Sequence, residues 1–441
     1  MRPCRQGLVC AALALAACSS TPTATFTVTT GDETDAFTRS PAPTTLVVDA
    51  LDLTGNAQEI ARAALPADTL PLGDKARTDV GAIRVTALDA AGTQLLRGET
   101  LYVQFGALEN TPLEVFVQRL GELARMPRSG AALDAPRLGV TNARYVIAAS
   151  GIQVLVYDLL TLQALSGIPS FPRAAKSLVT FGAAAIAIDE QGATTIDLST
   201  AQTSELTAPA GGSFAEVAGG MTISAPDGSA YVIGGTRTSG GPSQRVLSIT
   251  KDGAIAFVTL AVPREGACAT WVDGRGVVIV GGNVPGAAGS NNATVGVEVL
   301  APGSAQATQL SFPADAVKGC GASTLDASHV LVAGGVGSSA DVGGAAPARV
   351  VDLACGSMCT PAIWPGPLPL VRAESFTLAP GAALVAGDDA AGASHVFRVT
   401  ATESKEIPLK APRRNARMIG LPVKGTVAIV GGAAPIEQYI E

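Results

Sequence analysis

Val277-Val278-Ile279-Val280-Gly281-Gly282 is a short run of β-forming residues that ends in two glycines. Valine and isoleucine favour strands, and glycine can adopt the backbone conformations that end a strand abruptly. The pattern returns at intervals of roughly 40 to 50 residues, which is a period typical of repeat architectures. Its other copies are Tyr231–Gly235, Val330–Gly335, Val427–Gly432 and a degenerate copy at Ala383–Asp388.

Two earlier segments have the same strand pattern without the glycines, so we expect seven repeats. They are Arg144–Ser150 and Ala183–Ile188. After each glycine pair comes a variable loop and then an alternating strand; examples are Arg245–Ile249, Val295–Leu300, Arg349–Leu353 and His395–Val399. Each repeat therefore carries four strand candidates, which is the content of one blade of a β-propeller.

A Pro-Arg or Val-Arg element precedes the glycine strand in several repeats. The repeat with the fullest set of features contains Val330–Gly335, Asp352, Trp364, Leu368-Pro369 and Arg372. These features resemble the kelch repeat family, and the resemblance covers about residues 112 to 441. It implies a seven-bladed kelch-like β-propeller, although only Trp364 stands at the family's tryptophan position.

The last repeat is incomplete, because only Ile436–Ile440 follows its glycine pair. A propeller has to close in order to remove its exposed strand edges. The alternating segment Leu113–Arg119 precedes the first repeat and reads as the missing outer strand. We therefore predict that it pairs with the segment near Tyr439.

The N-terminus reads as a lipoprotein signal peptide over residues 1–18. Arg2 and Arg5 precede an apolar stretch that is too short to span a bilayer. The sequence Leu15-Ala16-Ala17-Cys18 resembles the lipobox of bacterial lipoproteins, which implies cleavage and a lipid on Cys18. Because Ser19 replaces the aspartate of an inner-membrane retention signal, the resemblance implies the outer membrane of the cell envelope. An ordinary secretory signal is the alternative.

Three further regions follow the signal. Residues 19–43 have the composition of a tether, although Thr25–Thr29 alternates and reads as a possible first strand. Residues 44–110 contain short alternating strands that resemble a small immunoglobulin-like β-sandwich. A weak helical period stands out near Ala57–Leu65. Residues 111–441 form the predicted propeller.

Composition supports an all-β protein and limits its partners. The chain has 441 residues, 50 of them Gly and 28 Pro, and its formal charge is −7. Frequent turn residues among many β-formers indicate short strands. The negative charge argues against nucleic acid as a partner, and removal of Arg2 and Arg5 would increase it.

Four cysteines remain beyond the lipobox, and an even number in an exported chain suggests disulfides. Cys268 and Cys320 each precede a glycine-pair strand, so they could face each other from neighbouring repeats. Cys355 and Cys359 would close a small loop. A zinc site made by the four thiolates is the alternative.

Catalytic motifs are not evident, and we expect no cofactor and no metal site. The two histidines, His329 and His395, adjoin predicted strands and are expected to be structural. The adjacent acids Asp189-Glu190 and Asp388-Asp389 could serve calcium, but solvated turn carboxylates are the simpler interpretation.

One face of the predicted propeller is a candidate binding surface. The loops 236–244, 283–294 and 336–348 are long, and variable loops often carry function. Four arginines would surround the same face: Arg173, Arg264, Arg372 and Arg413. The alternative is that these arginines pair with acids of their own repeats.

The sequence thus predicts an envelope-anchored lipoprotein whose propeller binds or scaffolds a protein or polysaccharide. A carbohydrate-active lyase, epimerase or oxidase is an alternative. A purely structural envelope assembly protein is another.

Overall fold

The fold is described from a computed structural model, which describes residues 26–66, 79–105, 113–237, 240–282, 296–337, 341 and 344–441. Within these ranges nearly all regular structure is β-strand, and a short 3₁₀ helix, η2, spans Phe214–Val217. The prediction of an all-β protein is confirmed. Seven sheets of four antiparallel strands contain most of the described strands.

In each of these sheets the strands are hydrogen-bonded in the order in which they are named here. The first three sheets are β10 (Arg137–Thr141), β11 (Tyr145–Ser150), β12 (Gln153–Asp158) and β13 (Gln163–Ala164); β14 (Ser177–Phe181), β15 (Ala184–Ile188), β16 (Ala193–Asp197) and β17 (Gln202–Leu206); and β18 (Met221–Ser224), β19 (Ala230–Ile233), β20 (Ser243–Ile249) and β21 (Ile255–Arg264). The next three are β22 (Cys268–Val272), β23 (Gly276–Val280), β24 (Val297–Leu300) and β25 (Thr308–Gln309); β26 (Gly321–Thr324), β27 (His329–Ala333), β28 (Arg349–Asp352) and β29 (Ala362–Ile363); and β30 (Arg372–Ala379), β31 (Ala382–Asp388), β32 (Ser394–Thr400) and β33 (Ser404–Glu406). The seventh is β34 (Arg417–Gly420), β35 (Thr426–Val430), β36 (Glu437–Ile440) and β9 (Leu123–Arg125).

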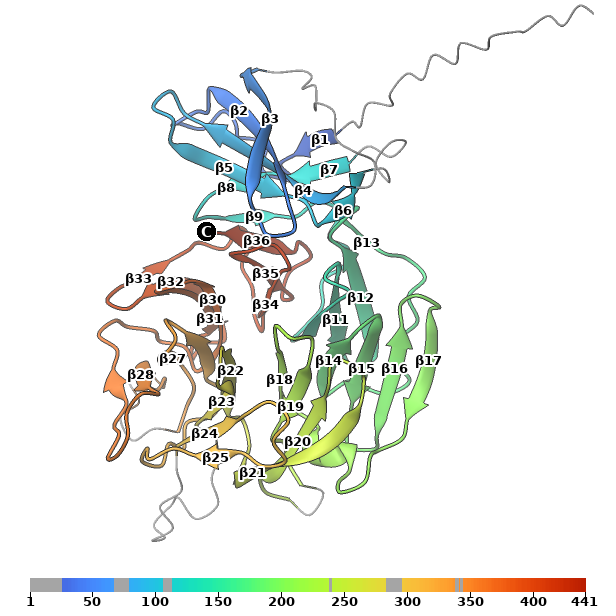
Figure 1. The fold of residues 1–441 in the computed structure, drawn as a ribbon, viewed down its shortest axis with the longest axis vertical. Helices are drawn as coiled ribbons and strands as arrows, with labels where there is room; N and C mark the ends of the chain where they lie inside the picture. Colours follow the sequence, from blue (N-terminus) through green and yellow to red (C-terminus); the bar gives the residue numbers. More distant parts are fainter. Residues whose placement is uncertain are drawn as a thin grey trace, which may run out of the picture.

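The seven sheets are arranged around a common centre (Figure 1). The first strand of each sheet contacts the first strand of the next, and β34 of the seventh sheet contacts β10 of the first. A buried hydrophobic cluster lies between each pair of neighbouring sheets, and the cluster around Val146 and Ala428 joins the seventh sheet to the first. Strands covered on both faces are apolar throughout, which explains the continuous apolar runs of β23 and β35.

The glycine pairs let neighbouring sheets approach each other closely. Gly281 has a positive φ of 69°, and a Cβ at this position would lie 2.5 Å from the carbonyl oxygen of Val317. Val317 belongs to the segment that leads into β26 of the next sheet, and its carbonyl oxygen accepts a hydrogen bond from the Gly282 N–H at 2.7 Å. A side chain at Gly281 would therefore push the two sheets apart.

The ring closes through β9, and this corrects the predicted closing strand. Leu123 of β9 pairs with Tyr439 of β36, so the expected partner region is correct. The predicted segment Leu113–Arg119 has another role: β7 (Leu113–Phe116) pairs with β1 (Phe26–Thr29), and β8 (Gln118–Arg119) pairs with β5 (Gln94–Glu99). Alternation alone could not distinguish these positions, because it marks a half-buried strand in any sheet.

Substitution of Ala124 by Pro is expected to lower the free energy of unfolding by about 3 kcal/mol or more, because it removes a ladder hydrogen bond inside the closing strand. Chemical denaturation measures this loss. The control is Thr308→Pro at the first residue of the outer strand β25, a position where proline is tolerated. Equal losses in the two variants would contradict the closing role of β9.

The N-terminal unit is a separate small sheet structure. Its main sheet runs in the order β3 (Ala57–Ala64), β2 (Thr45–Leu51), β4 (Val80–Leu88), β5 and β8, and β6 (Val103–Gln104) also pairs with β4. A shared core including Val48, Val85 and Val115 packs β1 and β7 against this sheet. The unit therefore uses residues on both sides of the predicted range 44–110, and β1 lies within the predicted tether.

The weak helical period near Ala57–Leu65 was misleading, because Ala57–Ala64 is strand β3. Within the described ranges this strand pairs with β2 alone, at the edge of its sheet, and many of its side chains are exposed. The pairing along β2 also shifts register between Val48 and Asp49. Exposure and a register shift both weaken the alternation that marks a strand.

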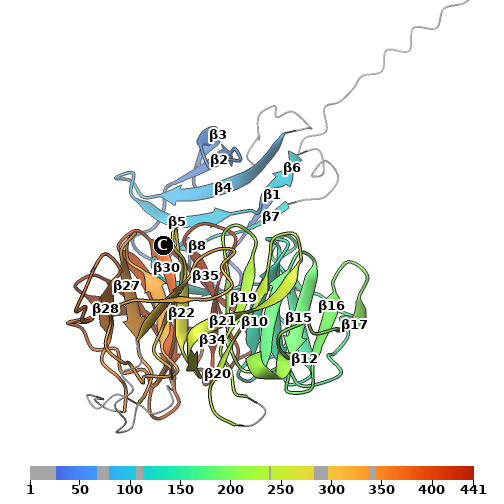
Figure 2. The same ribbon diagram turned by 60° about the horizontal axis from the view of Figure 1, so that its bottom comes forward.

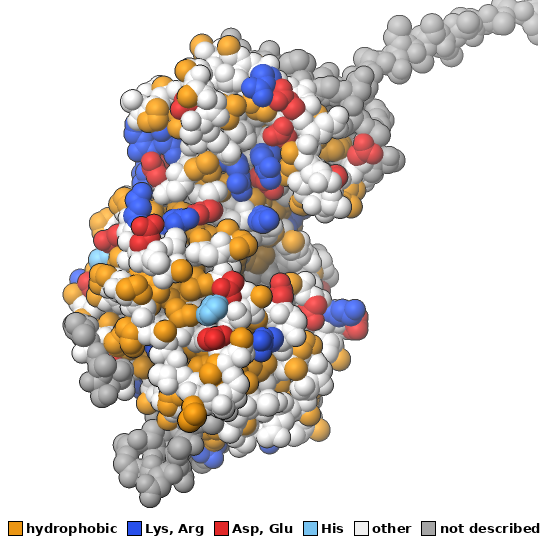
Figure 3. All heavy atoms as spheres, turned by 60° about the vertical axis from the view of Figure 1, so that its left-hand side comes forward, with side chains coloured by type: hydrophobic (Ala, Val, Ile, Leu, Met, Phe, Trp, Pro, Cys, Tyr) orange, Lys and Arg blue, Asp and Glu red, His pale blue; other side chains and the backbone are white. Residues whose placement is uncertain are grey.

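The N-terminal unit sits against the seventh sheet at the rim of the ring (Figures 1 and 2). Arg97 Nη2 donates to the carbonyl oxygen of Lys424 at 3.1 Å, and Gln118 Nε2 donates to that of Gln438 at 3.1 Å. Charges of both signs gather along this junction (Figure 3). The ion pair of Arg125 with Glu33, at 2.9 Å, also joins the two parts. Lys424 lies in the turn that connects β34 to β35. The loops that follow the glycine pairs lie at the other end of these strands. The unit therefore contacts the first strands of the ring at the end opposite to those loops.

Candidate functional site

The candidate site is the loop-bearing face, defined as the end of the ring where the first strands begin and the loops after the second strands emerge. The longest of these loops connect β19 to β20, β23 to β24 and β27 to β28. Residues 283–294 of the predicted loops, and parts of the other two, lie outside the described residues. The four predicted arginines can be placed on the structure directly.

Arg264 and Arg413 are fully buried, so the prediction of a solvent-facing arginine ring is wrong for both. Arg264 Nε donates to Glu298 Oε1 at 2.8 Å, and both side chains are 0% exposed. Arg413 repeats this contact with Glu437, at 3.1 Å from Nε and 2.9 Å from Nη2. Each guanidinium also donates to the carbonyl oxygen of the first glycine in its glycine pair, Gly281 or Gly431.

The fifth sheet contains the same pair with its charges exchanged. Arg349 pairs across the strands with Val332, as Glu298 does with Ile279, so the two residues hold equivalent positions. Arg349 Nε donates to Asp315 Oδ2 at 2.7 Å. Because the ion pair persists when the signs are reversed, its role is to join the segment before the first strand of a sheet to the third strand of that same sheet.

Arg173 and Arg372 lie nearer to solvent but are also paired within the ring. Arg173 Nε donates to Asp189 Oδ2 at 2.6 Å, and its terminal nitrogens contact Glu205 at 2.8 and 3.0 Å. Hydrogen bonds to Glu205 and Asp189 raise the pKa of Arg173. Arg372 Nε donates to Asp388 Oδ2 at 2.9 Å. The four arginines thus pair with acids of the ring, as the alternative interpretation held.

The acids Asp189 and Asp388, which were considered as calcium ligands, are already engaged by arginines and neighbouring groups. Asp189 accepts from Arg173 and from the turn N–H groups of Gln191 and Gly192, and Asp388 accepts from Arg372 and Ser394. Across the described ranges, no group of three or more His, Cys, Asp or Glu residues is placed to hold a metal ion.

Two further arginines on this face were missed. Arg137 and Arg417 are the first residues of β10 and β34, and Arg372 is the first residue of β30. The carboxylate of Glu374 lies between Arg372 and Arg417. A signal was available for Arg137, because it follows Pro136 and completes a Pro-Arg element immediately before a strand.

Both expected disulfides are present. The Cys268–Cys320 bond joins the start of β22 to the residue before β26, so it links neighbouring first strands at the loop-bearing face. The Cys355–Cys359 bond closes a short loop after β28. Disulfides of this kind persist in oxidising compartments.

The histidines lie in local polar networks. His329 Nδ1 contacts Asp326 Oδ2 at 2.8 Å. His395 Nδ1 lies 2.8 Å from Glu406 Oε1, and its Nε2 lies 3.3 Å from Asp389 Oδ2. The hydrogen bond with Glu406 raises the pKa of His395, with a further contribution from Asp389 and an opposing one from burial.

The raised pKa of His395 predicts a pH-dependent stability. The His395 contacts stabilise the fold fully below the unfolded pKa of about 6.5, and this stabilisation is lost as pH rises through the folded pKa. The difference in unfolding free energy between the wild type and His395→Gln should therefore be larger at pH 5.5 than at pH 8.5. Denaturant titrations at the two pH values measure it. A difference that stays constant or grows with pH would refute this assignment.

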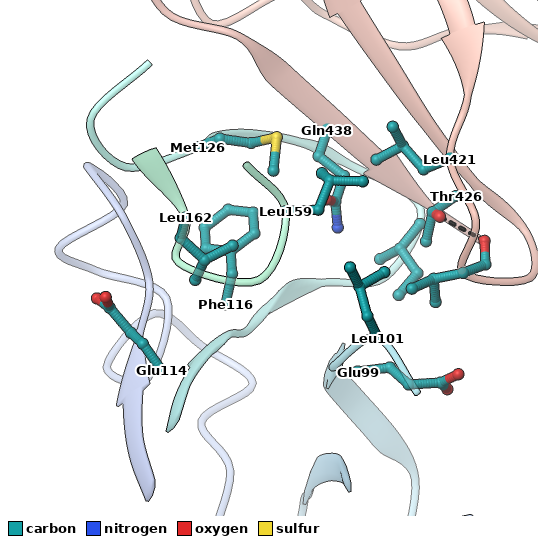
Figure 4. Close-up of a pocket in the computed structure, with 12 residues that line it drawn as sticks. Glu99, Leu101, Glu114, Phe116, Met126, Leu159, Leu162, Leu421, Thr426 and Gln438 are labelled. Carbon is teal, nitrogen blue, oxygen red and sulfur yellow. Dashed lines mark hydrogen bonds between the residues drawn. The ribbon is translucent and has the colours of Figure 1, made fainter. Parts of the chain in front are cut away.

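A shallow pocket lies between the N-terminal unit and the seventh sheet (Figure 4). It is lined mainly by apolar side chains, including Leu101, Phe116 and Leu421, and its volume is about 30 Å³. Ligand pockets are typically ten or more times larger, and a volume of this size holds about two water molecules. The pocket is a packing gap at the junction rather than a ligand site.

The comparisons with known proteins show no family. No family model matches the chain, and no curated protein matches it. The N-terminal domain of Nup159 is similar in structure at 9% identity and a TM-score of 0.31, over 73% of this chain and 85% of that one. The extracellular domain of BT4673 from B. thetaiotaomicron, in structures described as a one component and a hybrid two component system, matches at 9% identity with TM-scores of 0.21 and 0.22. The two matches cover 87% and 94% of this chain, and 67% and 69% of the matched chains, respectively.

These similarities are too weak to indicate a function. In the described part of the chain, no helix has the length and apolar character needed to cross a bilayer.

Proposed function

We propose that this protein is a lipid-anchored lipoprotein of the bacterial cell envelope, in the outer membrane. In this proposal the ring of seven sheets is a seven-bladed kelch-like β-propeller, and the N-terminal unit is an immunoglobulin-like spacer. The loop-bearing face binds a protein or polysaccharide partner and thereby acts as a scaffold. The lipid-bearing residue is Cys18, which lies outside the described residues.

One observation carries the binding role: the N-terminal unit packs along the edge of the seventh sheet and leaves the rest of the loop-bearing face uncovered (Figure 2). The unit contacts the turn around Lys424 at the other end of the inner strands. The long loops after Ile233 and Ala333 emerge on the uncovered face. Loops presented by a rigid scaffold are where binding sites tend to occur, and the two disulfides fit an exported protein.

Partner capture tests the binding role. Full-length protein is cross-linked in native envelopes, and its partner profile is compared with that of a variant whose loop 336–348 is replaced by a short Gly-Ser linker. The control variant has the Asp273-Gly274-Arg275 turn replaced, at the opposite end of β22. Loss of partners in the loop variant alone supports the proposal, whereas the same profile in all three proteins overturns it.

The anchor is tested separately. Cells are grown with a clickable fatty acid, and label incorporation is compared between the wild type and Cys18→Ser. Label in the wild type that disappears in the variant supports lipidation at Cys18. Absence of label in both proteins, at equal expression, overturns it.

A further inference from the structure

An arginine stands at the start of the first strand in each of the sixth, seventh and first sheets. Arg372 starts β30, Arg417 starts β34 and Arg137 starts β10. These strands are consecutive neighbours in the ring, since β34 contacts both β30 and β10. The arginines therefore gather at the central end of the loop-bearing face, and we call this group, together with Glu374, the arginine cluster.

The carboxylate of Glu374 lies between Arg372 and Arg417 but does not satisfy them. Its Oε1 is 3.7 Å from Arg372 Nη1 and 3.6 Å from Arg417 Nη1, and both distances exceed direct hydrogen-bond length. Its Oε2 instead accepts from the backbone N–H of Met418 at 2.5 Å. Arg372 Nη1 and Arg417 Nε are buried nitrogens without a hydrogen-bond partner.

Arg137 is the least satisfied member of the cluster. Among the residues that the structure describes, no hydrogen bond or ion pair engages its side chain. Burial lowers the pKa of Arg137, and the nearby charge of Glu374 raises it while that of Arg372 lowers it. A half-buried guanidinium beside other guanidiniums is costly unless an anion accompanies it.

The cluster carries more positive than negative charge, so its net charge favours one further anion. Three guanidiniums face the carboxylates of Glu374 and of Asp388, which already pairs with Arg372. One positive charge therefore remains uncompensated when both acids are ionised. A single carboxylate would neutralise it, and guanidinium donors match the planar geometry of a carboxylate. Glu374 shows that a carboxylate fits among these side chains.

We infer that the arginine cluster binds a carboxylate group presented at the loop-bearing face, either from the acidic side chain of a peptide or from a small free acid. Arg137 and the unpaired nitrogens of Arg372 and Arg417 supply the donors. Glu374 is the internal competitor, which the incoming carboxylate displaces or which takes up a proton. This inference deepens the proposed binding role of that face and rests on it.

The pH dependence follows from the same groups. Burial raises the pKa of Glu374 to about 7, with Arg372, the Met418 N–H and Arg137 acting in the opposite direction and Asp388 adding to the rise. Below this value Glu374 is neutral and the cluster carries an additional net positive charge. Carboxylate binding should therefore be tighter at pH 6 than at pH 8.

The test is isothermal titration of the full-length protein, at low salt, with malonate and with a capped hexaglutamate peptide. Both probes should bind, and Arg137→Gln should weaken binding about tenfold or more, because a charged hydrogen bond is lost. Its thermal stability should not fall, because the Arg137 side chain makes no hydrogen bond or ion pair in the described structure and its unneutralised charge is costly. The matched control is Arg275→Gln, in the turn at the other end of β22, which should bind as the wild type does.

Glu374→Gln provides a second, independent test of the carboxylate site if Arg137→Gln folds poorly. Glu374→Gln should tighten binding of both probes and remove most of the difference between pH 6 and pH 8. A peptide that binds at least tenfold more tightly than malonate assigns the carboxylate to a protein partner, and equal affinities assign it to a free acid. Oligogalacturonate binding more tightly than the peptide would overturn both assignments.

Other outcomes would overturn the carboxylate site itself. These are the absence of binding by both probes, wild-type affinity in Arg137→Gln, or sulfate binding as tightly as malonate. Because the titration uses isolated protein, it can fail while partner capture by the loops succeeds. The two proposals can therefore be distinguished.

Discussion

Replacement of Arg264 by Ala is expected to lower the free energy of unfolding by about 3–5 kcal/mol, because it leaves the carboxylate of Glu298 buried without its counter-charge. Among the described residues, Glu298 would keep the backbone N–H donors of Ala261 and Val262, at 2.7 and 3.2 Å. The carbonyl oxygen of Gly281 would also lose a donor. Urea denaturation monitored by circular dichroism measures the loss.

The control for this variant removes both charges together. The double substitution Arg264→Met with Glu298→Leu should be considerably closer to the wild type than Arg264→Ala, because no uncompensated charge remains. Arg173→Ala should also cost less than Arg264→Ala, since Arg173 is partly exposed and its pairing is screened by solvent. If Arg264→Ala proved as mild as Arg173→Ala, the buried pair would not be a structural joint between sheets.

Removal of the Cys268–Cys320 disulfide is the second large effect. The bond spans 52 residues of sequence, and chain-entropy arguments give about 4 kcal/mol for a loop of this length. The double variant Cys268→Ala with Cys320→Ala should lose a comparable amount, which thermal and denaturant unfolding would measure. Both sulfur atoms are buried in the cluster between the fourth and fifth sheets, so the loss includes packing.

The second disulfide is the matched control. The Cys355–Cys359 bond spans four residues, for which the same argument gives about 2 kcal/mol. The variant Cys355→Ala with Cys359→Ala should therefore be the milder of the two. The reverse order of losses would show that Cys268–Cys320 does not hold neighbouring sheets together.

The repeat pattern could be predicted because the residue types that favour strands and turns stand at the positions where packing between sheets requires them. The run Val277–Val280 is apolar at every position because both faces of β23 are covered by neighbouring sheets. The glycines after it are needed for close approach of the next sheet. The paired cysteines and the region that closes the ring could also be recognised, because equivalent repeat positions imply neighbours in space.

The sequence-based predictions were wrong where a strand or a side chain pairs with residues far away in the sequence. The segment Leu113–Arg119 alternates as well as a closing strand would, but only the folded N-terminal unit shows that β7 and β8 are used there. The burial of Arg264 and Arg413 depends on Glu298 and Glu437, which lie 34 and 24 residues away. Spacing to the glycine pairs placed these arginines on the correct face but could not show that their guanidiniums turn inward.

The most direct test of the closed ring is a cross-link between β9 and β36. Ala124 and Gln438 are paired across these strands, and opposite residues in antiparallel strands lie at a Cα separation compatible with a disulfide. The variant Ala124→Cys with Gln438→Cys should form this bond under mild oxidation, as peptide mass mapping would show, and should become more stable to denaturant. The control pair Ala124→Cys with Gln309→Cys, whose second cysteine lies on β25 of the fourth sheet, should remain unlinked. Failure of the first pair to link, in protein whose two native disulfides are intact, would contradict the closed ring of seven sheets.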